Sequence, residues 1–219
     1  MGFLTYPIFL IMGYLMGSIP TGLLMVKLVK GKDIRKIESG RTGATNTLRA
    51  AGFWAAFITW VVDVMKATLA VWIVRAVAPG NYLLEALVAL AAILGHNYSL
   101  FLFEKTPEGK WRGRGGAGGA PCIGGMLAFW PPSLLIIIPV GGFILYFIGY
   151  ASVGTVSVAI MATIILGWRA AAGISSWDYI VYGIGSIALL GYALRPNLIR
   201  LFQGTERIVG FRARNKPKA

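Results

Sequence analysis

The sequence has few of the residues that build metal sites, disulfides and acidic surfaces. Its 219 residues contain one cysteine, Cys122, and one histidine, His96, with only eight Asp and Glu. A single cysteine excludes an internal disulfide and gives no indication of the redox compartment. A metal site made of His and Cys ligands is not expected, because it needs several such side chains. We therefore expect neither a metal nor another cofactor.

Charged residues of both signs are scarce as well. They make up 13% of the chain, whereas hydrophobic residues make up 57%. A soluble domain carries roughly a quarter charged residues, so this balance indicates an integral membrane protein. The first apolar segment is long and uniform and lacks a small-residue cleavage pattern. We therefore do not interpret it as a signal peptide.

The charge that is present is mostly positive and is concentrated in three patches. The formal net charge is +13, and eighteen of the twenty-one Lys and Arg residues lie in 27–49, 105–114 and 195–218. Lys and Arg accumulate in the cytoplasmic loops of membrane proteins, so the three patches are expected in the cytoplasm. This distribution explains the charge without a nucleic-acid partner.

The apolar segments predict an all-α polytopic membrane protein with about seven transmembrane helices, one of them short. The predicted segments are 4–26, 53–77, 83–103, 121–130, 133–150, 153–168 and 177–194. An odd number keeps the basic patches on one side, with the N-terminus outside and the C-terminus in the cytoplasm. Residues 1–219 are expected to form a single integral-membrane domain with a basic tail over 195–219.

The most distinctive stretch is 39–49, which is polar and lies between the first two apolar segments. It combines Gly40 and Gly43 with four hydroxyls, one amide, Arg41 and Arg49. Small residues, turned backbone N–H groups, short hydroxyls and Arg suit a phosphate-sized anion. A solvated loop between two membrane helices explains the composition equally well.

Two further polar stretches are expected on the same side. The glycines of 113–119 offer backbone N–H groups to an anion, or form a flexible linker. Arg195 and Asn197 follow the last apolar segment and are expected to face the first loop, or to contact anionic lipid. The convergence of the three stretches indicates an anion site at the membrane surface.

Several polar residues lie within or at the ends of the apolar segments. Asp63 and Lys66 are three residues apart and share one helix face, as a structural ion pair or as the polar floor of a site. His96 ends the third segment, where it caps carbonyls or takes part in catalysis. Ser152 and Thr155 enter the sixth segment, as helix caps or as phosphate donors.

Together these features indicate chemistry that joins a phosphorylated head to a fatty chain. The chain resembles the bacterial membrane acyl-phosphate:glycerol-3-phosphate acyltransferase family over 8–207. The resemblance rests most on 39–46 with Arg49, against the family's Ser-Gly-Asn-x-Gly-Ala-Thr-Asn-x-x-Arg. The other matching motifs are Gly-Ser-Ile-Pro-Thr-Gly at 17–22, Asp63-x-x-Lys66, Gly95-His96 and Arg195-x-Asn197 with Arg200.

The resemblance implies a seven-helix bundle with its active site on the cytoplasmic face of the bacterial inner (plasma) membrane. It implies acyl transfer from acyl phosphate to the first hydroxyl of glycerol 3-phosphate, giving lysophosphatidic acid and phosphate in phospholipid synthesis. Arg49 and Arg114 are the predicted catalytic residues, with Asp63, Lys66 and His96 in support. The predicted binding residues are Ser39, Gly40, Gly43, Thr45, Asn46, Arg49, Gly113, Gly115, Ser152, Arg195 and Asn197.

Three positions depart from the family pattern. Arg114 takes the place of the lysine in Gly-Gly-Lys-Gly-x-Ala-Thr, and in another register Ala117 takes it. Leu194 stands where the family has a histidine, and Arg41 stands where it has an asparagine. Arg keeps the charge of Lys but not its size or donor geometry.

These departures keep a second hypothesis open. The chain would then be a non-catalytic relative that binds lipid or phosphate as a structural subunit beside other membrane subunits. A third hypothesis is a transporter for an anionic metabolite, which Asp63 and Lys66 suggest. No inverted repeat supports a transporter.

Overall fold

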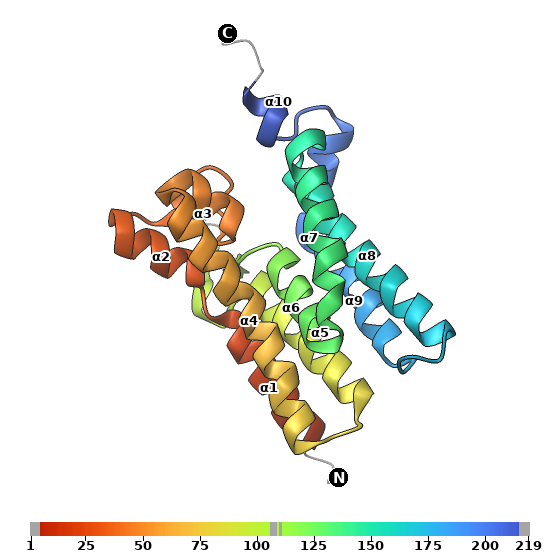
Figure 1. Ribbon diagram of the computed structural model, residues 1–219. Coiled ribbons are helices and arrows are strands. Elements are labelled where there is room, and N and C mark those ends of the chain that lie inside the picture. The colour runs from red at the N-terminus through yellow and green to blue at the C-terminus, as the bar shows by residue number, and fades with distance from the viewer. Residues whose placement is uncertain (1–4, 106–108, 110, 215–219) are drawn as a thin grey trace.

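The structure is a computed structural model that describes residues 5–105, 109 and 111–214, and it is a bundle of helices (Figure 1). The first half of the chain forms α1 (Thr5–Ser18), α2 (Thr21–Lys30), the 3₁₀ turn η1 (Ile34–Lys36), α3 (Ala44–Ala51), α4 (Phe53–Val77), α5 (Tyr82–Asn97) and η2 (Leu100–Leu102). The strands β1 (Phe103–Lys105) and β2 (Trp111–Gly113) then pair antiparallel.

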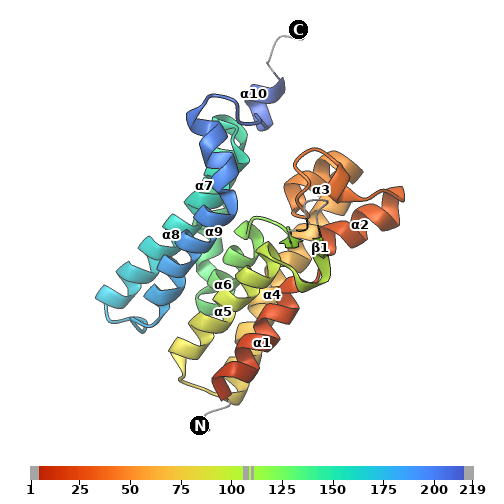
Figure 2. The same ribbon diagram turned by 180° about the vertical axis from the view of Figure 1, so that it is seen from behind.

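The second half forms a further set of helices. They are α6 (Gly119–Phe129), η3 (Pro131–Ser133), α7 (Leu134–Phe143), the π-helical η4 (Ile144–Ile148), α8 (Ala151–Ala171), α9 (Tyr179–Phe202) and α10 (Gly210–Arg214). In both views α10 lies at the opposite end of the molecule from the start of α1 (Figures 1 and 2). The helices α2 and α3 lie on one side of that end, and α7 lies with α10 on the other side.

The multi-pass, all-α membrane class is confirmed. Within the described residues, five segments are long and apolar enough to span a membrane: Thr5–Lys30, Phe53–Val77, Tyr82–Leu102, Pro131–Ile148 and Ala151–Ala171. α6 is a shorter apolar helix of 11 residues, and the 24-residue α9 packs against α5 and α8. The number of crossings, the side of each end and the single domain stay predictions.

The continuous first helix predicted for 4–26 is wrong in the part that the structure describes, and Leu4 lies outside it. α1 ends at Ser18 and α2 begins at Thr21. Pro20 between them lacks an N–H and disfavours helical geometry at Ile19. The freed Ile19 carbonyl accepts a hydrogen bond from Lys66 Nζ of α4 at 2.5 Å, so a neighbouring helix stabilises the break.

Other boundaries differ from the prediction as well. The third predicted segment, 83–103, is helical as α5 only to Asn97, and β1 begins at Phe103. The second half of the polar stretch 39–49 is helical, because Gly43 in an extended conformation begins α3. The last predicted segment, 177–194, continues as α9 to Phe202 through Pro196. A proline removes one helical hydrogen bond, and the Arg41 side chain donates to the nearby carbonyl of Ala193.

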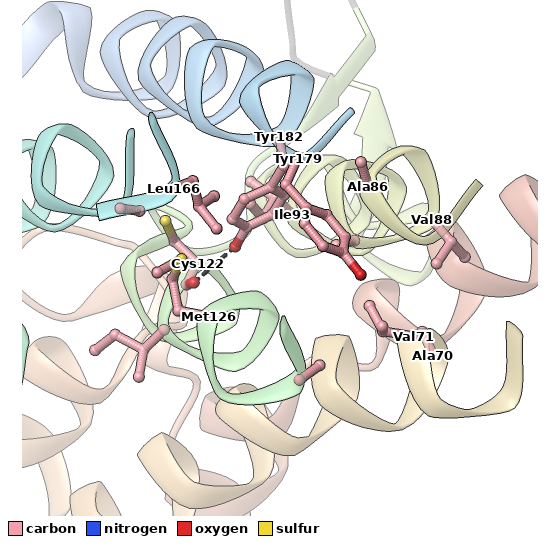
Figure 3. Packing of buried hydrophobic residues seen from close by; sticks show 14 of the residues in the cluster. Ala70, Val71, Ala86, Val88, Ile93, Cys122, Met126, Leu166, Tyr179 and Tyr182 are labelled. Atoms are coloured by element: carbon pink, nitrogen blue, oxygen red, sulfur yellow. Dashed lines mark hydrogen bonds between the residues drawn. The ribbon is translucent and has the colours of Figure 1, made fainter. Parts of the chain in front are cut away.

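The short helix α6 lies in the core of the bundle, which explains why it does not need the length of a lipid-facing span. Gly124 of α6 packs directly on α4, since a Cβ there would lie 2.0 Å from the Val64 oxygen. Tyr182 of α9 donates to the Cys122 carbonyl of α6 at 2.6 Å (Figure 3). The predicted short helix is therefore observed, and most of its residues are buried.

Candidate functional site

A cavity of about 320 Å³ brings together the segments that the sequence analysis expected to converge. Part of its wall is polar, and part is apolar and made by α6, α7 and α8. The polar lining includes Ser39, Arg41, Thr45, Asn46, Arg49, Asp63, His96, Ser152, Asn197, Glu206 and Arg207. The apolar lining includes Ile123, Ile137, Ile138, Leu145 and Val158. The cavity therefore has room for a charged group beside an apolar one.

Three helices begin at the cavity. Residues 43–45 at the start of α3, 118–120 at the start of α6 and 151–152 at the start of α8 all line it. None of the three helices has a side-chain hydrogen bond at its N-cap. A helix N-terminus carries a partial positive charge and unsatisfied N–H groups, which favour an anion. Three such ends at one cavity favour a multiply charged anion.

Two arginines add full positive charge. Arg49 in the last turn of α3 is exposed, lines the cavity and makes no hydrogen bond or ion pair with any described residue. Arg41 donates to the Gly116 carbonyl at 2.8 Å and to the Ala193 carbonyl, while its buried Nε has no partner. Burial lowers the pKa of Arg41 to about 10, and the charge of Arg114 acts in the same direction. Arg41 therefore stays protonated at neutral pH.

The predicted pair Asp63 and Lys66 forms a buried ion pair below the cavity. Lys66 Nζ lies 2.5 Å from Asp63 Oδ1, and the two side chains are 4% and 1% exposed. His96 Nδ1 lies 3.7 Å from the same Asp63 oxygen, which is too long for a hydrogen bond. Asp63 and His96 line the cavity and Lys66 is not among its lining residues. The interpretation as a buried ion pair is confirmed. Asp63 also lines the cavity, and its role in a site stays a prediction.

The glycine-rich stretch is held in place by the end of α5. Gly115 N–H donates to Asn97 O and Gly116 N–H donates to His96 O, each at 2.9 Å. A Cβ at Gly115 would lie 2.1 Å from His96 O, and one at Gly116 would lie 1.9 Å from His96 Nε2. The alternative of a flexible linker is therefore wrong for this part of the stretch.

Asn46 and Ser152 line the cavity in different ways. Asn46 Nδ2 donates to the carbonyls of Ile37 and Arg41 at 3.0 and 2.9 Å, so it fixes the shape of the preceding loop. Its Oδ1 is buried without a partner. Ser152 is 1% exposed, and its Oγ also has no partner among the described residues. A buried hydroxyl without a partner is costly, and a bound ligand would satisfy it.

The structure brings most of the predicted site residues to this cavity. Those that line it are Ser39, Gly43, Thr45, Asn46, Arg49, Asp63, His96, Ser152 and Asn197. Gly40 and Arg114 line a second cavity of about 70 Å³ with Arg35, Leu102 and Glu104. Gly113 packs on the Phe103 ring and Gly115 packs on α5. Lys66 and Arg195 are not among the residues that line either cavity, and Arg195 is exposed.

The structure adds residues that sequence reasoning did not place in the site. Arg41 lies inside the strongest motif, and Ala117 and Leu194 are positions where the family pattern is altered; all three line the cavity. Glu206 and Arg207 also line it. No sequence signal marked Glu206, because a lone carboxylate in a basic tail forms no pattern.

The fold and the cavity define a multi-pass membrane protein with a cationic internal site beside apolar walls. Residues 7–204 match the model of a family described as glycerol-3-phosphate acyltransferase. A glycerol-3-phosphate acyltransferase of Thermus thermophilus is 38% identical over 204 residues, which cover 93% of this chain and 95% of that protein. Glycerol-3-phosphate acyltransferase 2 of Moorella thermoacetica is 35% identical over 93% of this chain and 97% of its own.

Solved structures give the same result. A crystal structure of PlsY (YgiH), an integral membrane glycerol 3-phosphate acyltransferase in its glycerol 3-phosphate form, matches with a TM-score of 0.78 and 28% identity. The match covers 95% of this chain and 98% of that one. The lysophosphatidic acid form of PlsY matches with a TM-score of 0.75. The chain belongs to the glycerol-3-phosphate acyltransferase family.

Proposed function

We propose that this chain transfers an acyl group from acyl phosphate to the first hydroxyl of glycerol 3-phosphate. The observation that carries the proposal is the position of the cationic part of the cavity beside its apolar wall. The uncapped starts of α3, α6 and α8 suit phosphate oxygens, and Ile137, Ile138 and Val158 suit the first carbons of an acyl chain. The relatives' names support glycerol 3-phosphate as the acceptor.

The reaction needs positioning more than it needs a protein nucleophile. The glycerol hydroxyl oxygen attacks the carbonyl carbon of acyl phosphate, the bond from that carbon to the phosphate oxygen breaks, and inorganic phosphate leaves. The departing phosphate accepts the hydroxyl proton, so the products are lysophosphatidic acid and phosphate. Acyl phosphate is already activated, so close approach and charge stabilisation supply much of the lowering of the barrier.

The residues at the cavity have different roles in binding the substrates and stabilising charge. Arg49, with no protein partner among the described residues, binds a substrate phosphate at the mouth together with Ser39 and Thr45. Ser152 Oγ donates to a phosphate from the start of α8. Arg114 lies close enough to lower the pKa of Arg41, so it adds to the positive potential of the site. The site faces the cytoplasm at the bacterial plasma membrane in this proposal, because the basic patches surround it.

A specific observation favours the alternative of a non-catalytic, phosphate-binding subunit. Ala117 and Leu194 present apolar side chains to the cavity at positions where the family pattern has a lysine (in one register) and a histidine.

A second observation favours catalysis. The guanidinium of Arg41 lies next to both positions, because it bonds to the carbonyls of Gly116 and Ala193. A positive charge is thus retained beside the altered positions, which supports a catalytic protein over a non-catalytic one.

The donor distinguishes the proposal from related chemistry. The purified chain in detergent is supplied with glycerol 3-phosphate and either palmitoyl phosphate or palmitoyl-CoA. We expect lysophosphatidic acid and inorganic phosphate in equal amounts from palmitoyl phosphate only. Formation of lysophosphatidic acid from palmitoyl-CoA, but not from palmitoyl phosphate, would contradict acyl phosphate as the donor. No product from a folded preparation, together with stable co-purification of other membrane subunits, would support the structural subunit.

A further inference from the structure

The carboxylate of Glu206 lies where an anionic ligand is expected. Glu206 is 8% exposed and lines the cavity, as does the following residue, Arg207. Both follow residue 204, where the match to the family ends. Three helix N-termini and several arginines stabilise a negative side chain in this cavity, as they would stabilise a bound anion.

Glu206 occupies groups that suit a phosphate. Asn197 Nδ2 donates to Glu206 Oε1 at 2.8 Å, and Arg200 Nε donates to Glu206 Oε2 at 3.2 Å. An amide and a guanidinium bind a carboxylate and a phosphate through the same kind of oxygen and with the same geometry. Asn197 is also a residue that the sequence predicts to bind substrate. The carboxylate and a substrate phosphate therefore compete for the same donors.

The segment around Glu206 is held by contacts with η4, with the start of α8 and with Glu38. We call residues 205–212 the tail strap. Arg207 Nη1 lies 3.6 Å from Glu38 Oε2 with both side chains about half exposed. Val209 N–H donates to Gly149 O at 2.8 Å, and Arg212 Nη1 donates to Ile148 O at 3.0 Å. An exposed ion pair contributes little. The strap is also held by the bridge between Tyr150 and Ile208 and by Phe211, whose ring lies beside Tyr146. Release therefore concerns first the part around Glu206 and Arg207.

We propose that Glu206 is a built-in competitor of the substrate: its carboxylate holds Asn197 and Arg200 in the empty site, and a substrate phosphate displaces it and releases the tail strap. The inference rests on the proposed function, because it takes Asn197 as a phosphate ligand. A phosphate monoester carries more negative charge than a carboxylate at neutral pH, so it binds the shared donors more strongly. The two anions do not stay side by side, because like charges repel in a buried site.

The first arm of the test removes the charge of Glu206. Glu206→Gln keeps the size of the side chain, and the affinity of the full chain in detergent is measured for inorganic phosphate and for glycerol 3-phosphate. If Glu206 holds the donors about 90% of the time, its removal raises the apparent affinity about tenfold. Asp178→Asn, which removes one carboxylate before the distant start of α9, is expected to leave both affinities unchanged.

The second arm follows the strap itself by hydrogen exchange. In the wild type, adding inorganic phosphate is expected to speed exchange of backbone amides in 205–212, including that of Val209. In Glu206→Gln the same amides are expected to exchange fast without phosphate. Slower exchange on adding phosphate would show that the strap closes over the ligand, and this result would overturn the inference.

The outcomes separate the inference from the proposed function. Lysophosphatidic acid formation by the wild type, without a gain of phosphate affinity in Glu206→Gln, overturns the inference and leaves the function. Tighter phosphate binding by Glu206→Gln without turnover in either protein supports the inference and contradicts the function. Failure of both proteins to bind phosphate contradicts both. If Glu206→Gln does not fold, Glu206→Asp is measured, and its shorter reach is expected to give a smaller gain in affinity.

Discussion

The guanidinium of Arg41 donates to the carbonyl oxygen of Gly116 at 2.8 Å, which joins the first polar loop to the glycine-rich stretch. Through its other terminal nitrogen, Arg41 also reaches the carbonyl of Ala193 in α9. One side chain thus connects two of the stretches that the sequence predicted to converge and reaches α9 two residues before the third. It also places a positive charge beside Ala117, which takes the place of the family's lysine in the second of the two registers.

Arg41 is therefore expected to do part of the work of a lysine at position 117. Arg41→Asn is expected to lower kcat/KM for glycerol 3-phosphate about 10- to 100-fold, because a hydrogen bond to a charged group contributes about 1.5–3 kcal/mol. Arg41→Asn combined with Ala117→Lys is expected to recover most of that loss. Steady-state kinetics with palmitoyl phosphate measures both variants.

The single variant Ala117→Lys is the control for this exchange. It is expected to be less active than the wild type, because a second buried cation next to Arg41 is repelled. Each lysine is also introduced into Arg41→Asn. If Arg114→Lys restores kcat/KM in that variant and Ala117→Lys does not, then Arg114, and not Arg41, replaces the family's lysine.

The buried ion pair of α4 predicts a non-additive loss of stability. Lys66→Met leaves the carboxylate of Asp63, which is 1% exposed, without its cation. Breaking a buried pair costs about 3–5 kcal/mol, and the carbonyl of Ile19 loses one of its two donors and keeps the Thr21 N–H. Thermal unfolding in detergent is expected to show a large loss in Lys66→Met and a smaller one in Asp63→Asn with Lys66→Met. A double variant no more stable than Lys66→Met would contradict the pair's role.

The close packing of the glycine-rich stretch predicts sensitivity to a single methyl group. Gly115→Ala is expected to lower the free energy of unfolding by about 2–3 kcal/mol, since its Cβ would meet the His96 carbonyl at 2.1 Å. The matched control is Gly191→Ala in α9, where no atom lies within 4 Å of the added Cβ. That change is expected to be neutral or slightly stabilising, because alanine favours a helix over glycine. Equal effects of the two changes would contradict the packing described.

The hydroxyl of Ser152 predicts opposite effects on stability and activity. Ser152→Ala removes a buried oxygen that has no protein partner in the described part of the chain, so stability is expected to stay the same or rise by about 1 kcal/mol. Activity is expected to fall through a higher KM for glycerol 3-phosphate, because a phosphate donor is lost. Ser157→Ala on the same helix, whose Oγ donates to Gly154 O at 2.9 Å, is the control, with unchanged KM expected. A lower stability with unchanged KM in Ser152→Ala would show that Ser152 has a structural role.

Much of the fold was predictable because its signals are local. The segment 53–77 is observed as α4 with the same bounds, since it is a long, mostly apolar run between Gly52 and Pro79-Gly80. The composition alone indicated a multi-pass helical membrane protein. The polar stretch 39–49 was traceable to the cavity because its glycines, hydroxyls and arginines form a compact pattern.

The features that were missed depend on contacts between distant segments. The break after α1 has a local cause in Pro20, but its stabilisation by Lys66, which bonds to the Ile19 carbonyl 47 residues earlier in the chain, is not visible in the sequence. Arg41 appeared as a departure from a motif, and only the structure shows that it reaches α9. Glu206 enters the site because Asn197 and Arg200 bind its carboxylate, and spacing in the sequence does not show this.

Acyl transfer by the purified chain is the most direct test of the central claim. Wild type, Arg49→Ala and the exposed control Lys30→Ala are each given palmitoyl phosphate and glycerol 3-phosphate, and lysophosphatidic acid is measured. We predict turnover by the wild type and by Lys30→Ala, with a loss of about 100-fold or more in Arg49→Ala, as for removal of a group that stabilises charge in the transition state. The absence of lysophosphatidic acid from folded wild type, or equal turnover by Arg49→Ala, would contradict the account.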